Sequence, residues 1–344
     1  MKSREAIIAF ARESLGLSPD LNVELFPFEG RGSDRTYYRL LWGTGSSAIL
    51  VHYKPDRIEN TYYADIARFL LDIDIPVPEI FRHDPDGGFV LMEDLGDIDL
   101  WSLRNESWEV RRCLYQKALR IVHKLHSLPK CQFPFDRVRL TEAFGPILYR
   151  WERDYFKENF IAGLCRIDLE PGDSVRLEIE LSALAERLSS GRQSLVHRDL
   201  QSQNVMIFRE EPFLIDFQGM RFGTRFYDLG SILCDPYVSF SADERNELLR
   251  YYYDLAQDNT GWSGFQIAFW EASAQRMMQA LGAYGFLGIT KGLKNYLDHV
   301  PGGIRNLRAA AENVVSLPIL REVCVRCEEA MRNSRLSIRD SRLV

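Results

Sequence analysis

The chain has 344 residues, 46% of them hydrophobic, and its 43 basic and 49 acidic residues give a net charge of −6. This length exceeds one ordinary hydrophobic core, so we expect a globular protein with two lobes or domains. Because acidic residues outnumber basic ones, we expect no extended basic surface that could bind a nucleic-acid phosphate backbone, and therefore no nucleic-acid partner.

The first residues predict a helix rather than a signal peptide. Apolar residues recur at helical spacing over residues 7–15, but Arg12 and Glu13 interrupt the run before a signal-peptide core could form. The longest uncharged runs, such as 277–290, are shorter than the roughly 20 apolar residues of a membrane-spanning helix. Six cysteines without a signal sequence are typical of free thiols. We therefore expect a soluble, cytoplasmic protein with no membrane partner.

The first 95 residues predict an antiparallel sheet. Aromatic and β-branched runs, separated by turn residues and one helix, occupy residues 23–28, 36–42, 47–53, 79–83 and 88–93. Residues 60–72 have helical periodicity, and the segment Pro76-Val77-Pro78 ends that helix. The prediction is a five-stranded sheet with one inserted helix.

The hydrophobic period changes from 2 to 3.6 near Leu95, which predicts a lobe boundary without a flexible linker. Helical patterns follow at 107–128, 141–165 and 174–190, and the chain is again mostly helical from residue 226. We therefore divide the chain into an N-terminal lobe, residues 1–95, and a helical C-terminal lobe, residues 96–344.

A polar motif between two short apolar strands lies in the C-terminal lobe. Residues 197–204 read HRDLQSQN, and Asp216 follows Phe-Leu-Ile and precedes Phe217. The pattern H-x-D-x-x-x-x-N, followed by apolar-apolar-D-F, is the catalytic and metal-binding signature of protein-kinase-like phosphotransferases. A small β-rich lobe before a larger helical lobe is also the order of such folds. The sequence therefore predicts an α+β, bilobal, protein-kinase-like fold, with a nucleotide-binding N-terminal lobe and the acceptor site in the C-terminal lobe.

Three polar side chains of this motif fit the demands of phosphoryl transfer. The reaction needs a group that orients the acceptor hydroxyl and metal ions that neutralise the phosphates. Mg²⁺ prefers oxygen ligands and keeps several waters, so one carboxylate and one amide oxygen suit it when nucleotide phosphates complete the set. We assign Asp199 as the catalytic base, and Asn204 and Asp216 as Mg²⁺ ligands.

A turn that closes a β-hairpin is the alternative interpretation of HRDLQSQN, because Asp and Asn are common in such turns. His197 is expected to support the loop rather than to transfer a proton. Asp228 either caps the helix that follows it or lies buried beneath the catalytic loop as a brace.

Candidate nucleotide-binding residues lie in the N-terminal lobe. Backbone N–H groups of the turn between the first two strands could cover the phosphates, and its residues include Gly30, Gly32, Ser33 and Arg35. A glycine-containing hairpin turn would look the same, so this role depends on the motif downstream. At the lobe junction, Glu93 and Leu95 are expected to bind adenine through backbone groups.

Lys54 is the candidate lysine for the phosphates, and it stands at the end of the third predicted strand. Alternation would place it on the same face as Leu50, and a solvated charge is the alternative interpretation. Its candidate carboxylate partners are Glu59 and Asp65, both near the start of the predicted helix.

Several stretches resemble the aminoglycoside phosphotransferase and choline kinase superfamily, and within it the bacterial kinases that phosphorylate N-acetylmuramate and N-acetylglucosamine at the anomeric hydroxyl. They are GRGSDRTYYRL (30–40), LMEDLGD (91–97), HRDLQSQNVM (197–206), IDFQGMRFGTRFYDL (215–229), AQRMMQALGAYGFL (274–287) and YLDHVP (296–301). The resemblance implies ATP and Mg²⁺ as cofactors, the roles already assigned to the motif, and an amino sugar of cell-wall recycling as acceptor. It also implies that the helical region around Trp151, Arg153 and Tyr155 helps to wall the sugar site, and the alternative for these three residues is a place in the core or on a solvated helix face.

Some residues depart from the sugar-kinase pattern and leave the acceptor open. Gly219 stands where an acidic residue is expected, and Gln201 and Gln203 replace more typical His and Arg. A cationic aminoglycoside or a choline-type amino alcohol is therefore the alternative acceptor. Such an acceptor would favour a strongly acidic lid, but residues 141–170 hold only six acids against four bases and the segment after residue 270 is net basic, so the charge balance favours a neutral or anionic acceptor. The alternative from another class is a nucleotide-binding pseudokinase adaptor, whose expected mark is the loss of a motif residue. All three motif residues are present.

Overall fold

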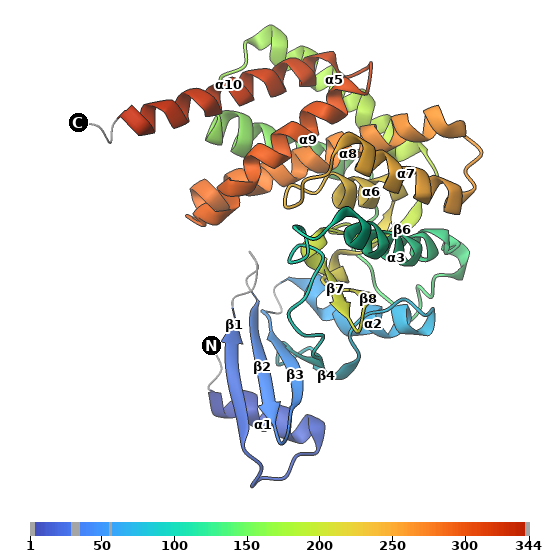
Figure 1. The fold of residues 1–344 in the computed structure, drawn as a ribbon, viewed down its shortest axis with the longest axis vertical. Coiled ribbons are helices and arrows are strands. Elements are labelled where there is room, and N and C mark those ends of the chain that lie inside the picture. The colour runs from blue at the N-terminus through green and yellow to red at the C-terminus, as the bar shows by residue number, and fades with distance from the viewer. Residues whose placement is uncertain (1–3, 29–34, 55–56, 341–344) are drawn as a thin grey trace.

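The structure is a computed structural model that describes residues 4–28, 35–54 and 57–340, without the side chains of 334–340. Figure 1 shows a small part built on an antiparallel sheet and a larger part built from helices, with the short strands β7 (Val205–Phe208) and β8 (Glu211–Leu214) where the two parts meet. This is the predicted α+β arrangement. The sheet ends at Glu93, and the division of the chain at residue 95 stays a prediction.

The strands of the sheet pair antiparallel in the order β1-β2-β3-β5-β4. Their bounds are β1 (Val23–Phe28), β2 (Thr36–Trp42), β3 (Ser46–His52), β4 (Ile80–Asp84) and β5 (Phe89–Glu93). The turn between β2 and β3 contains Gly43 and Gly45, whose φ angles of 55° and 88° favour glycine. The predicted five strands are confirmed.

One face of the sheet is covered by helix α1 (Arg4–Leu15). Leu40, Leu50 and Leu91 are buried there together with Ile7 of α1. Because side chains alternate across a strand, the neighbours of these leucines face the other way.

The opposite face of the sheet belongs to the main core of the molecule. Ile49 and Val51 of β3 are buried in that core with residues of helix α2 (Tyr63–Asp72) and of the helical part. The Tyr63 ring stacks on the Phe217 ring, with centroids 4.4 Å apart. Phe217 follows the predicted metal ligand Asp216, so the inserted helix and the segment that carries Asp216 share one hydrophobic core.

The larger part is built on long helices. They are α3 (Trp108–Ser127), α4 (Pro146–Phe156), α5 (Pro171–Ser190), α6 (Arg225–Leu233), α7 (Ala242–Ala256), α8 (Gly261–Gly285), α9 (Val300–Glu312) and α10 (Pro318–Asp340). Helix α8 is the central one, because most residues of its second half are buried and it packs against α4, α6 and α9.

The helix predicted over 141–165 is shorter than expected. It begins at Pro146. Proline suits this position because the N–H groups of the first turn have no acceptor within the helix, so the N–H that proline lacks is not missed. It ends at Phe156 and continues as a π-helical segment, η3 (Lys157–Leu164). Other short helical turns are η1 (Ile58–Tyr62), η2 (Lys130–Gln132), η4 (Ser202–Asn204), η5 (Phe217–Gly219), η6 (Phe286–Thr290) and η7 (Lys294–His299).

Short strands hold the two motif segments in place. Strand β6 (Ser194–Val196) pairs with β9 (Arg221–Gly223), and β7 (Val205–Phe208) pairs with β8 (Glu211–Leu214). The HRDLQSQN segment therefore joins β6 to β7, which do not pair with each other. The alternative interpretation of this segment as a hairpin turn is wrong.

Candidate active site

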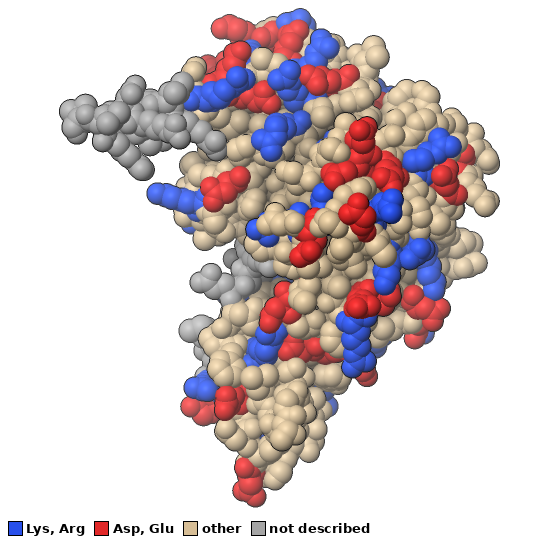
Figure 2. All heavy atoms as spheres, viewed as in Figure 1, with Lys and Arg blue, Asp and Glu red and all other residues tan. Residues whose placement is uncertain are grey.

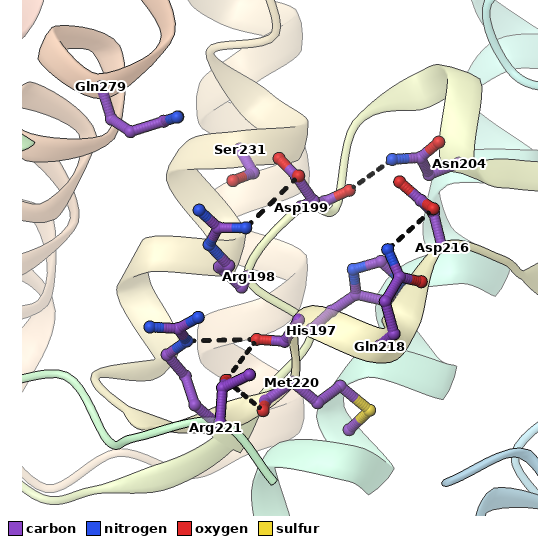
Figure 3. Close-up of polar contacts among 12 residues, drawn as sticks. His197, Arg198, Asp199, Asn204, Asp216, Gln218, Met220, Arg221, Ser231 and Gln279 are labelled. Atoms are coloured by element: carbon purple, nitrogen blue, oxygen red, sulfur yellow. Dashed lines mark hydrogen bonds and ion pairs between the residues drawn. The ribbon is translucent and has the colours of Figure 1, made fainter. Parts of the chain in front are cut away.

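The structure brings Asp199, Asn204 and Asp216 together, although they come from two loops (Figure 3). The Asn204 side-chain N–H donates to the backbone carbonyl of Asp199 at 2.9 Å. The backbone carbonyl of Asn204 accepts from the N–H of Ile215 at 3.0 Å. These bonds fix the loop that carries Asp199 against the segment after β8, which carries Asp216.

Two non-glycine residues of these loops have left-handed backbones. The φ angle is 76° at Arg198 and 63° at Asp216. Such conformations cost free energy unless the surroundings hold them, and they are concentrated at functional sites. Here the turn at Arg198 presents Asp199, and the turn at Asp216 places its carboxylate within 3.0 Å of the Gln218 amide.

Asp228 is the brace of the catalytic loop, and the interpretation as a helix cap is wrong, since Thr224 precedes the helix. Its carboxylate is fully buried and accepts from the backbone N–H groups of His197 at 2.6 Å and Arg198 at 2.8 Å. His126 of α3 contacts the same carboxylate at 3.0 Å. One side chain thus holds two consecutive backbone groups just before Asp199.

His197 supports the loop, as predicted. Its ring is buried, and Nε2 donates to the backbone carbonyl of Ile215 at 2.9 Å. Because Ile215 precedes Asp216, His197 ties the two loops of the site together from below.

Replacing Asp228 by alanine should lower the free energy of unfolding by about 3 to 5 kcal/mol, because two buried N–H groups and His126 lose their acceptor. Urea denaturation followed by circular dichroism measures this change. The control is Asp254→Ala, which removes an exposed carboxylate paired with Arg250 and should cost less than about 1 kcal/mol. Equal destabilisation by the two variants would contradict the assigned role of Asp228.

Arginines surround Asp199. Arg276 of α8 donates to Oδ1 of Asp199 at 3.0 Å, and the Arg198 guanidinium lies 4.0 Å from Oδ2. Burial by itself would raise the pKa of Asp199, but the positive charges of Arg276 and Arg198 outweigh it, so the pKa lies below the usual aspartate value. Asp199 is therefore an ionised carboxylate at neutral pH, suited to accept a hydrogen bond from a hydroxyl.

Asp216 and Asn204 fit the ligand set expected for Mg²⁺. Both line the cavity described below, and they offer a carboxylate and an amide oxygen. The amide N–H of Asn204 is used by Asp199, which leaves the amide oxygen for a metal. Within the described residues, no group of three or more His, Cys, Asp or Glu side chains is arranged to hold a metal by itself. Waters and nucleotide phosphates would supply the other ligands, as is usual for Mg²⁺.

A cavity lies between the sheet and the motif loops. Its apolar walls are side chains of β3, β5 and β7 together with Ile215, and Asp216 and Asn204 lie at its polar end. Glu93 and Leu95 line it, as the predicted adenine position requires. The N–H of Glu93 is taken by the carbonyl of Glu79 at 2.9 Å, so an adenine contact at Glu93 would have to use its carbonyl.

Arg35 also lines the cavity, and its guanidinium donates to Oδ1 of Asp216 at 2.5 Å. Burial disfavours the charge of Arg35, but the Asp216 carboxylate raises its pKa above the usual arginine value. The other residues predicted for the phosphate turn, Gly30, Gly32 and Ser33, lie outside the described residues.

The structure does not bring Lys54 to the cavity. Lys54 is exposed, whereas Ile49, Val51 and Tyr53 are the residues of this segment that line the cavity. Neither Glu59 nor Asp65 lines the cavity; the residue of the helical insertion that does so beside Tyr63 is Asn60.

Sequence reasoning missed Arg39 and the arginines around Asp199. Arg39 of β2 lines the cavity and forms ion pairs with Asp94 at 2.7 Å and Asp97 at 2.8 Å, both just after β5. The signal was available, because alternation places Arg39 on the cavity face of β2 and LMEDLGD supplies the acids. Arg153 is buried and pairs with Glu178 of α5 at 2.6 Å, which fits its alternative interpretation as a residue of the core.

A model of the Phosphotransferase enzyme family matches residues 24–266, from β1 into α8. Two curated relatives that match are each named N-acetylmuramate/N-acetylglucosamine kinase. The relative from Neisseria meningitidis serogroup B is 25% identical over 297 residues, which cover 85% of this chain and 86% of the relative. The relative from Pseudomonas aeruginosa is 25% identical over 327 residues, which cover 91% of each chain.

Solved structures of lower identity share the fold. The ADP-bound aminoglycoside phosphotransferase APH(2'')-Ib matches with a TM-score of 0.59 and 15% identity, over 91% of this chain and 100% of that chain. A choline/ethanolamine kinase family protein from Mesorhizobium loti matches with a TM-score of 0.59 and 16% identity, over 92% and 99% of the two chains. The predicted kinase-like fold is confirmed.

Proposed function

The chain belongs to the phosphotransferase enzyme family and acts on a hydroxyl acceptor, and from this premise we propose that it transfers the γ-phosphate of ATP to an amino sugar of cell-wall recycling. The observation that carries the proposal is that Asn204 and Asp216 lie together at one end of the cavity, with Asp199 bonded to Asn204 just beyond it. In this proposal Asp199 orients the acceptor hydroxyl and takes its proton. Asn204 and Asp216 hold Mg²⁺, which supplies positive charge to the phosphates.

The cavity supports ATP as the donor. Its walls are apolar at Ile49, Val51 and Ile215, where a flat base would be desolvated, and its polar end carries Asp216 and Arg35. Asp199 is absent from the residues that line the cavity and lies beyond Asn204. This separation supports nucleotide on one side of the loop and acceptor on the other.

Positive charge around Asp199 supports a neutral or anionic acceptor. Arg276 and Arg198 lie beside the Asp199 carboxylate, and a third arginine, Arg221, is near enough for the charge of Arg198 to add to burial in lowering its pKa to about 10. Gly219 adds no compensating acid; a Cβ atom at this position would lie 3.2 Å from Cδ of Arg198. A cationic aminoglycoside or choline would meet like charge, which costs several kcal/mol when charges are desolvated. The relatives named N-acetylmuramate/N-acetylglucosamine kinase support the same choice.

We expect purified protein with Mg²⁺ and ATP to phosphorylate N-acetylmuramate or N-acetylglucosamine with a kcat/KM at least about 100-fold above that for aminoglycosides or choline. A coupled ADP-release assay across this panel measures the ratio, and NMR of the product locates the phosphate. Faster turnover of a cationic acceptor would support the alternative acceptor class. Nucleotide binding without transfer to any member of the panel would support the adaptor.

The proposal includes a cytoplasmic location and no nucleic-acid or membrane partner. All six cysteines are free thiols, as is usual in a reducing compartment. Across the part of the chain that the structure describes, no helix combines the length and the apolar character needed to cross a bilayer. On the face drawn in Figure 2, acidic and basic side chains of the described residues are interspersed over both parts of the molecule.

A further inference from the structure

Arg276 of helix α8 is buried and reaches the active site, although α8 contains none of the residues Asp199, Asn204 and Asp216. We propose that Arg276 is a positioning residue for Asp199: its guanidinium fixes one carboxylate oxygen, so that the other is presented to the acceptor hydroxyl. The inference rests on the proposed role of Asp199 as the base.

The hydrogen bonds of Arg276 engage all three nitrogens of its guanidinium. Nη2 donates to Oδ1 of Asp199 at 3.0 Å, Nε donates to Oγ of Ser231 at 2.8 Å, and Nη1 donates to the Gln279 side-chain oxygen. The Arg276 side chain is only 3% exposed, whereas that of Asp199 is 36% exposed. A guanidinium held at three nitrogens cannot follow Asp199, so Asp199 must adopt the orientation that Arg276 sets.

The packing of α8 against α6 brings Arg276 close enough to reach the loop. A Cβ atom on Gly230 of α6 would lie 2.9 Å from the Cα atom of Ser273, so the two helices are in backbone contact at this point. Ser231 follows Gly230 and holds Nε of Arg276. On the side of Asp199 away from Asn204, Figure 3 shows Ser231 and, further out, Gln279.

The geometry divides the two oxygens of Asp199 between different tasks. Oδ1 is taken by Arg276, whereas Oδ2 is 4.0 Å from the Arg198 guanidinium, beyond hydrogen-bond distance. Oδ2 is therefore the atom that can accept a hydrogen bond from an incoming hydroxyl. Without Arg276 the carboxylate could rotate, and the hydroxyl would lose its fixed direction toward the phosphate.

The test is steady-state kinetics of Arg276→Gln and Arg276→Lys in the full chain, with N-acetylmuramate and N-acetylglucosamine as acceptors. We expect Arg276→Gln to lower kcat about 10- to 100-fold, with the KM for ATP unchanged, because misplacement of a reacting group costs rates of this order. Arg276→Lys keeps the buried charge and should recover part of the loss. In the Asp199→Asn background, Arg276→Gln should add little, because it acts through Asp199.

Arg111→Gln is the matched control, because it breaks another largely buried arginine–carboxylate pair, with Glu244 between α3 and α7. The melting temperatures of all variants show whether a loss of activity comes from unfolding or from misplacement of the Asp199 carboxylate. Three results would overturn the proposal: an additive loss in the Asp199→Asn background, a raised KM for ATP with kcat unchanged, or a loss equal to that of Arg111→Gln. If Asp199→Asn itself keeps full activity, the proposed base is wrong instead.

Discussion

Replacing Asp199 by asparagine should lower kcat by about 100- to 10,000-fold, the usual contribution of a positioned general base, while ATP still binds. Asparagine keeps the shape of the side chain, and its oxygen can still accept from Arg276. The other atom becomes an amide nitrogen, which donates a hydrogen bond instead of accepting one. The acceptor hydroxyl then loses the group that orients it. Long incubations with radiolabelled ATP measure the residual rate, and calorimetry measures ATP binding.

The control for this prediction is Asp243→Asn, a change of the same chemistry at an exposed position in the first turn of α7. It should leave kcat unchanged. A rate for Asp199→Asn within about threefold of the wild type would contradict the assignment, since that is well below the range expected for a general base. A loss of ATP binding in parallel with kcat would also contradict it, because Asp199 is placed on the acceptor side of the loop.

The fold was largely predictable because its signals are local. Alternation gave the five strands of the sheet, and it placed Lys54 on the face of Leu50, which packs against α1 and away from the cavity. The helix over 141–165 was less well predicted, since amphipathic spacing does not show where a proline begins a helix. Nor does it show where the chain changes to π-helical geometry, as it does at Lys157.

The site was predictable where its residues are close in sequence and not where they are distant. Asp199 and Asn204 share one loop, so their spacing was informative. Arg276 is 77 residues from Asp199, and no spacing rule connects them. A weaker signal did exist, because Arg276 precedes the uncharged run 277–290, and a charge that borders a buried uncharged run needs a partner. That signal predicts a carboxylate partner for Arg276 but does not identify which carboxylate it is.

Replacing Asp216 by alanine should raise the Mg²⁺ concentration needed for half-maximal activity by at least about 100-fold. Mutation of a residue that only hydrogen-bonds to a metal ligand already lowers metal affinity by about 10- to 100-fold, and Asp216 is proposed as a ligand itself. Asp216 is the carboxylate at the end of the cavity next to Asn204, and its Oδ1 already binds the cation of Arg35 at 2.5 Å. A Mg²⁺ titration of the rate, with Mn²⁺ binding followed by electron paramagnetic resonance as a second readout, measures the change.

The control for Asp216→Ala is Asp97→Ala, which removes another carboxylate that lines the same cavity but pairs with Arg39. If metal binding depends on the position of one carboxylate, the Mg²⁺ concentration for half-maximal activity should rise only in Asp216→Ala. If it depends on the total negative charge of the cavity, both variants should move it alike, and the assignment of Asp216 would be wrong. When EDTA removes Mg²⁺, the loss of a metal ligand can no longer affect nucleotide binding. A large loss of nucleotide affinity of Asp216→Ala in EDTA would therefore indicate a damaged cavity.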